Sequence, residues 1–168
     1  MTFSVRTSTS VALACDALAL PRAVAHGALM IGALLLATLA TPAAAADPKG
    51  TWLTEDGRSR IAIGSCGGAL CGSISWLREP NDPATGKPKL DVNNTDAGKR
   101  NRPLLGVPIV LNMKPSGKPE QWAGSVYNAQ DGKTYTGYIT MQGASSLKLE
   151  GCALGGLVCK AQTWRRIN

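Results

Sequence analysis

The chain is predicted to be all-β: an eight-stranded antiparallel up-and-down barrel, preceded by a signal-peptide helix. Two observations predict the barrel. Beyond residue 50, turn-forming residues recur every eight to twelve positions, and the segments between them alternate apolar and polar side chains. Ile61 and Ile63, set against Arg60 and Ala62, illustrate the alternation. Closing such strands into a barrel also removes the exposed edges that an open sheet would leave.

The N-terminal segment has the composition of a secretory signal. The apolar run Ala28–Ala37 is followed by Ala43–Ala46, small residues of the kind that signal peptidase requires. We therefore expect residues 1–46 to be removed and residues 47–168 to form a single periplasmic or secreted domain. The run is too short for a transmembrane anchor. Its charged residues lie unusually far upstream, so an alternative start, at Met30 for instance, stays open.

The turn positions divide the domain into eight strands and one long connection. The strands are expected at 50–54, 58–65, 70–77, 107–113, 121–127, 133–142, 146–153 and 157–166. The connection, residues 78–106, is rich in Pro, Asn and Asp, and a loop of this length in a compact domain is usually functional or disordered. A short helical turn at Thr95–Lys99, capped by Asn94 or Thr95, would shorten it.

Charge and histidine content limit the possible functions. The formal net charge is +7, with the cations scattered apart from Lys99–Arg102 and Arg165-Arg166. An exported protein rarely meets nucleic acid, so this charge favours an anionic envelope component, or simply solubility. The only histidine, His26, leaves with the signal. Its loss excludes Ser-His-Asp and Cys-His catalysis and a His-ligated zinc site, and we expect neither a metal nor a cofactor.

Four cysteines follow the expected cleavage site. Cys66 and Cys71 flank one glycine-containing hairpin, and Cys152 and Cys159 flank another. Cross-strand neighbours can meet disulfide geometry, so we pair Cys66 with Cys71 and Cys152 with Cys159. Four cysteines allow three connectivities, and the other two stay open.

Both ends of the domain resemble lipocalin-like barrels. Gly50-Thr51-Trp52 opens the first strand as Gly-x-Trp does in lipocalins, and Thr163-Trp164-Arg165-Arg166 closes the last. In lipocalins an arginine of the final strand covers the early tryptophan at the closed end. The resemblance implies that Trp52 and either Arg165 or Arg166 close the barrel and contact no ligand. A cation–π contact of this kind contributes about 0.5–2 kcal/mol.

Longer phrases resemble one bacterial exported family, labelled domain of unknown function 2147. They are Gly-Thr-Trp-Leu-Thr-Glu-Asp-Gly (50–57), Cys-Gly-Gly-Ala-Leu-Cys-Gly (66–72), Asp-Val-Asn-Asn (91–94), Lys-Arg-Asn-Arg-Pro-Leu-Leu-Gly (99–106) and Tyr-Asn-Ala-Gln-Asp-Gly-Lys-Thr-Tyr (127–135). The resemblance implies a small lipocalin-like barrel outside the cytoplasm and carries over no catalytic residues. The Cys152–Cys159 couple is less typical of this family.

The residues expected to bind a ligand come from the long connection, one hairpin and two tryptophans. They are Trp76, Asp91, Asn93, Arg100, Arg102, Trp122, Tyr127 and Tyr135. The loop would act as a lid whose arginines clamp a carboxylate or phosphate. Alternatively, its Asp and Arg side chains pair with one another in an ordered loop. The two tyrosines are expected to face each other across their hairpin, and the two tryptophans to point inward.

The function we expect is binding of a small, mostly apolar ligand inside the barrel, with Arg100 or Arg102 orienting its polar end, and no enzyme activity. One alternative is an interaction protein whose basic exterior docks on an anionic envelope component. Another is a glycan hydrolase that uses a carboxylate pair such as Asp91 and Asp96.

Overall fold

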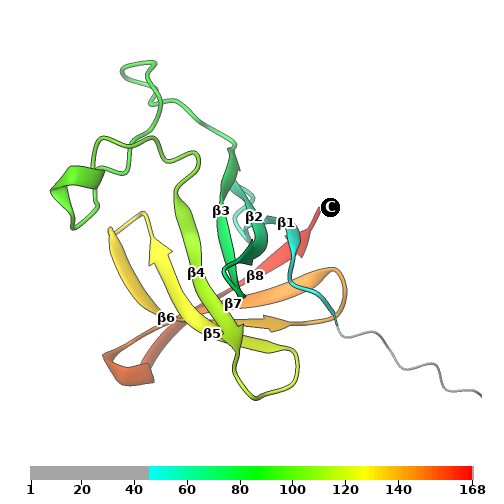
Figure 1. Cartoon of the computed structure of the whole chain (residues 1–168). Helices are drawn as coiled ribbons and strands as arrows, with labels where there is room; N and C mark the ends of the chain where they lie inside the picture. Colours follow the sequence, from blue (N-terminus) through cyan, green and yellow to red (C-terminus); the bar gives the residue numbers. More distant parts are fainter. Residues whose placement is uncertain (1–45, 168) are drawn as a thin grey trace, which may run out of the picture. The chain divides into compact units, whose positions relative to one another are not determined.

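The computed structural model describes residues 46–167, so the predicted signal peptide, apart from Ala46, lies outside the described residues. The strands are β1 (Gly50–Leu53), β2 (Ser59–Cys66), β3 (Ala69–Leu77), β4 (Pro108–Pro115), β5 (Gln121–Asn128), β6 (Lys133–Met141), β7 (Ser146–Ala153) and β8 (Val158–Arg166). Each strand pairs antiparallel with its neighbours in sequence, and β1 pairs with β8 to close the barrel (Figure 1). The predicted eight-stranded barrel is confirmed.

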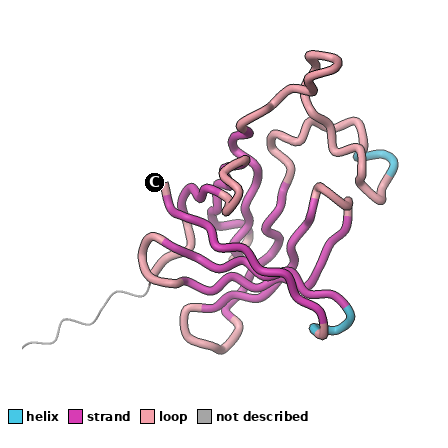
Figure 2. The backbone as a smooth tube through the Cα atoms, turned by 180° about the vertical axis from the view of Figure 1, so that it is seen from behind, coloured by secondary structure: helices cyan, strands magenta, loops and turns pink. Residues whose placement is uncertain are grey.

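Two 3₁₀ helices, η1 (Ala97–Lys99) and η2 (Leu154–Gly156), are short interruptions of an otherwise β structure (Figure 2). η1 lies where the helical turn was expected, but its N-cap is Asp96, which accepts the Gly98 N–H, and not Asn94 or Thr95. Among residues 46–167, no helix is long and apolar enough to cross a membrane.

Alternation places one face of each strand in the barrel interior. The interior side chains include Ile61, Val110, Ile139 and Leu147, each at most 2% exposed. These buried side chains of neighbouring strands pack together in one hydrophobic cluster. The core cluster extends from Trp52 to Trp164 and joins all the strands.

Arg166, and not Arg165, closes the barrel over Trp52. Its guanidinium carbon lies 4.2 Å from the centre of the indole ring. Arg166 also donates hydrogen bonds to the carbonyls of Ala144 (2.7 Å), Lys49 (2.6 Å) and Asp47. Trp52 is fully buried, and its Nε1 donates to the Pro48 carbonyl at 2.8 Å. The contacts of Arg166 therefore join the end of β8 to the segment that leads into β1.

Arg166→Gln is expected to lower the free energy of unfolding by about 2–4 kcal/mol, because it removes three charge-assisted hydrogen bonds and the cation–π contact. Arg165→Gln, which removes the same charge from an exposed neighbour, should change stability by no more than about 0.5 kcal/mol. Urea unfolding of both variants measures the difference. Equal losses would show that Arg166 does not close the barrel.

A β-bulge in the β2–β3 pair turns Trp76 outward. Arg60 pairs with Trp76, but the next residue, Ile61, pairs with Ile74, so the register shifts between them. The shift puts Trp76 on the same side as the exposed Arg60, whose guanidinium carbon lies 4.5 Å from the ring centre. The expectation that Trp76 points into the barrel is wrong, because a bulge breaks the alternation on which it rested.

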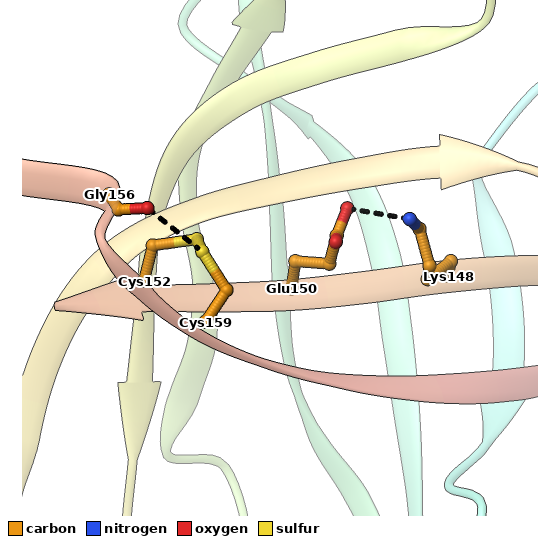
Figure 3. The surroundings of a disulfide bond; sticks show 5 residues. All are labelled: Lys148, Glu150, Cys152, Gly156 and Cys159. Atoms are coloured by element: carbon orange, nitrogen blue, oxygen red, sulfur yellow. Dashed lines mark hydrogen bonds and ion pairs between the residues drawn. A yellow bond between two sulfur atoms is a disulfide. The ribbon is translucent and has the colours of Figure 1, made fainter.

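Both predicted disulfides are confirmed. Cys66–Cys71 spans the β2–β3 hairpin with 5.8 Å between its Cα atoms, and Cys152–Cys159 joins directly paired residues of β7 and β8 at 4.0 Å. Figure 3 shows the second bond beside the Lys148–Glu150 ion pair, whose Nζ–Oε2 distance is 3.0 Å. Each bond fixes the register of one hairpin.

Candidate functional site

The connection between β3 and β4 lies at one end of the barrel, which we call the mouth (Figure 1). The turns between β1 and β2 and between β5 and β6 lie at the same end, since these strands run to it. Backbone hydrogen bonds hold the connection in place: the Leu104 N–H donates to the Lys89 carbonyl and the Gly106 N–H to the Ile74 carbonyl, both at 2.8 Å. The segment predicted as a lid is thus an ordered part of the domain.

Asp91 is the centre of a buried polar network in this connection. Its Oδ1 accepts a hydrogen bond from the Tyr127 hydroxyl at 2.6 Å. Its Oδ2 accepts from Asn94 Nδ2 at 2.8 Å and from both Nε and Nη2 of Arg102, at 3.0 and 2.8 Å. Asp91 is 0% exposed and Asn94 5% exposed. Both oxygens of this buried carboxylate accept hydrogen bonds, from Asn94 and Arg102 in the loop and from Tyr127 in β5. Asp91 therefore holds the loop on the barrel.

This environment shifts the pKa values of two groups. Burial raises the pKa of Asp91, but hydrogen bonds from Tyr127, Asn94 and Arg102, together with the charge of Arg102, outweigh burial and hold the pKa below its usual value. Burial and the neighbouring carboxylate of Asp91 raise the pKa of the Tyr127 hydroxyl. Asp91 is therefore ionised and Tyr127 neutral at pH 7.

The same loop rests on the β5–β6 hairpin. Asn93 Nδ2 donates to the Gln130 carbonyl at 2.9 Å, and the Thr95 N–H points to the Gly132 carbonyl at 3.4 Å. Arg100 is exposed and uses its Nε to donate to the Asn94 carbonyl at 2.8 Å. Asp91 and Arg102 thus pair with each other, as the alternative interpretation of the loop expected. Arg100 instead supports the loop backbone.

A cavity of about 740 Å³ opens at the mouth, between this connection and the end of the barrel. Ile74 and Leu77 of β3 and Leu104 of the connection supply apolar lining, and Leu90 and Val92 form part of its wall. Val92 is 61% exposed. The volume lies within the range of small-molecule sites.

Charged side chains also line this cavity. They are Asp56, Arg58, Arg78, Glu79, Asp82, Lys87 and Lys89. They come from the β1–β2 turn, the end of β3 and the start of the connection. An apolar lining with charged groups beside it suits a ligand with an apolar body and a polar end.

The structure separates the predicted ligand residues. Asn93 lines the cavity, whereas Asp91, Arg102 and Tyr127 form the buried network and Arg100 supports the loop backbone. Trp122 packs against the core at the opposite end of β5 from Tyr127, and Trp76 stacks on Arg60 outside the barrel.

Tyr127 and Tyr135 do not face each other. Tyr127 pairs with Thr134, and Tyr135 pairs with Val126, so the two rings lie on opposite faces of the hairpin. The Tyr135 hydroxyl donates instead to Asp131 Oδ2 at 2.6 Å. The expected pairing is wrong by one residue of register, which is enough to reverse a side chain's direction.

The carboxylates considered for hydrolysis have different environments. Asp91 is buried with both oxygens bonded, and Asp96 is exposed, with its Oδ2 2.9 Å from Lys99 Nζ. Among residues 46–167, no three His, Cys, Asp or Glu side chains are grouped so as to hold a metal ion.

Comparison with known proteins gives a family and a fold. The model of a family described as uncharacterised protein conserved in bacteria (DUF2147) matches residues 50–166. A structural match is protein HP1028 from the human pathogen Helicobacter pylori, which belongs to the lipocalin family. The TM-score is 0.61 at 23% sequence identity, and the match covers 73% of this chain and 84% of that one. No curated protein matches the sequence. The structural match supports a lipocalin-like barrel.

Proposed function

The chain belongs to DUF2147, an uncharacterised family conserved in bacteria, and from its lipocalin-like barrel and mouth cavity we propose that it binds a small, mostly apolar molecule. The observation that carries the proposal is the cavity of about 740 Å³ with exposed Val92 in its wall. Burying apolar surface contributes about 25 cal/mol per Å², so a ligand that covers Val92, Leu90 and Leu77 gains affinity from them.

The proposal places the ligand at the mouth. The core cluster takes buried side chains from every strand, and Ile74 belongs both to that cluster and to the cavity lining. The ligand would rest on the end of the packed core, with the connection beside it. Lipocalin-like folds offer such a site where the strand ends and loops meet.

We also propose that the protein works outside the cytoplasm. The support is its two disulfides, since such bonds persist mainly in oxidising compartments. Under this proposal the ligand is a molecule of the periplasm or the exterior.

A neutral apolar dye, N-phenylnaphthylamine, tests the proposal directly. Its fluorescence should rise saturably with wild-type protein, at a ratio of one dye per chain. Val92→Asp should weaken this binding by about tenfold, because it puts a charge in the apolar wall of the cavity. Leu157→Asp is the matched control: Leu157 is 86% exposed but lies in the β7–β8 turn, outside the cavity lining.

Both variants replace an exposed aliphatic residue with aspartate, one inside the cavity lining and one outside it. If dye binding is absent from the wild type, or if Val92→Asp and Leu157→Asp bind it equally, the cavity is not a ligand site. Both positions are exposed, so far-UV circular dichroism should show the barrel intact in each variant.

A further inference from the structure

A purely apolar ligand would give the cations that line the cavity no partner of opposite charge. Arg58, Arg78, Lys87 and Lys89 all line it. Lys89 is paired with Glu79, with 3.2 Å between Nζ and Oε2. Within residues 46–167, Arg58, Arg78 and Lys87 form no ion pair with a carboxylate.

The nearby carboxylates are occupied by the turns in which they lie. Asp56 Oδ1 accepts from the Arg58 N–H at 3.0 Å and from Thr54 Oγ1 at 2.7 Å. Asp82 Oδ1 accepts from the Ala84 and Thr85 N–H groups, both at 2.9 Å. These acids hold backbone turns. Asp56 lies near enough for the charges of Arg58 and Arg78 to act on its carboxylate, but neither arginine forms an ion pair with it within 4.0 Å.

Arg58 and Arg78 lie opposite each other at the end of the β2–β3 pair. The Arg78 N–H donates to the Arg58 carbonyl at 2.8 Å, one step beyond the last paired residues, Ser59 and Leu77. Like charges at facing positions of an antiparallel pair are destabilising. An anion bound between the two guanidinium groups would remove this repulsion and accept hydrogen bonds from both.

The cavity that these arginines line also has apolar lining. Leu77 precedes Arg78 in the chain, and both line the cavity together with Ile74 and Leu104. A molecule with one anionic end and an apolar tail would therefore meet the arginines and the apolar surface at the same time.

Resting on the proposed function, we propose that the ligand is an amphipathic anion. Its carboxylate or phosphate head group binds to Arg58 and Arg78 at the cavity edge, and its alkyl chain covers Leu77, Leu104 and Val92. Asp91, Arg100 and Arg102 take no part in contacting it. The arginine pair thus selects for the charge of the head group, and the apolar lining selects for the chain.

Calorimetric titration with three probes of equal chain length tests the proposal: dodecanoate, dodecyl phosphate and dodecanol, each kept below its aggregation concentration. The anions should bind about tenfold more tightly than the alcohol at low ionic strength, and salt should narrow the gap. Whichever anion binds more tightly identifies the head group. In the Arg58→Gln/Arg78→Gln variant, anion binding should fall to the level of the alcohol.

The control variant is Lys114→Gln/Lys160→Gln, which loses the same net charge at exposed positions outside the cavity lining. It should keep the preference for anions. If the alcohol binds as tightly as the anions, or if the two double variants behave alike, the head-group proposal is wrong while the apolar site stands. If none of the three probes binds, both the head-group proposal and the proposed function are wrong.

Discussion

Asp91→Ala is expected to destabilise the domain by about 3–5 kcal/mol, the largest effect of any single side-chain truncation in the connection. The substitution leaves the buried Tyr127 hydroxyl and Asn94 amide without their shared acceptor. It also removes the carboxylate partner of Arg102, whose side chain is 31% exposed. Two buried donors left unsatisfied cost about 1–3 kcal/mol each, and the lost ion pair with the partly exposed Arg102 adds a smaller amount. Total stabilities are about 5–15 kcal/mol, so the loss is a large fraction. Urea unfolding at pH 7 measures it.

Asp96→Ala provides the control for this prediction. Asp96 lies in the same connection but is exposed, and it holds only the η1 cap and the ion pair with Lys99. Its removal should reduce stability by no more than about 1 kcal/mol. If Asp91→Ala were as mild as Asp96→Ala, the Asp91 network would not be what holds the loop.

The same network predicts a pH dependence. The pKa of Asp91 is lower in the folded protein than its ordinary value of 3.8. A carboxyl of this kind contributes stability that is complete above its unfolded pKa and is lost as the pH falls through its folded pKa. The stability gap between the wild type and Asp91→Asn should therefore be constant near neutrality and shrink below about pH 4. Other carboxyls with lowered pKa values, such as Asp56 and Asp82, are common to both proteins and cancel in the difference.

The strands could be predicted because their signals are local. Alternating side chains such as Ile61 and Ile63, bounded by turn residues, give both the strand and its inner face. Cys66–Cys71 and Cys152–Cys159 follow from the hairpins between them, since close hairpin neighbours need no long-range information to pair. The closure of the barrel was predictable from the Trp52 and Arg165-Arg166 resemblance, but the choice between adjacent arginines depends on the register of β8 against β1.

The site could be predicted only in part, because it depends on registers and on packing between distant segments. A bulge reverses Trp76, and one residue of offset separates Tyr127 from Tyr135. Arg58 and Arg78 become neighbours only through the β2–β3 pairing. In the sequence each lies in its own polar segment, within 54–60 and 78–82, and nothing there connects the two. The available signal was that Arg58 begins one predicted strand, 58–65, and Arg78 directly follows the next, 70–77.

Gly132→Ala is expected to separate the connection from the β5–β6 hairpin and to destabilise the domain by about 3 kcal/mol or more. A Cβ at this position would lie 1.7 Å from the Asn93 carbonyl oxygen and 2.4 Å from its carbon. Both are backbone atoms, so no side-chain rotation relieves the overlap. The φ angle of +70° adds the ordinary cost of a left-handed alanine. Hydrogen exchange at the Asp91 and Asn94 amides and urea unfolding measure the two consequences.

Comparing Gly132→Ala with Gly143→Ala isolates the destabilisation that the steric overlap causes. Gly143 also has a positive φ, +94°, but a Cβ there would have no atom within 4 Å, so only the backbone strain of about 1–2 kcal/mol should be seen. The two variants should also differ in binding. Val92 and Asn93 belong to the cavity wall, so releasing Asn93 from the hairpin should weaken N-phenylnaphthylamine binding in Gly132→Ala and leave it unchanged in Gly143→Ala. Equal stability and equal dye binding in the two variants would mean that the hairpin does not hold the wall of the cavity in place.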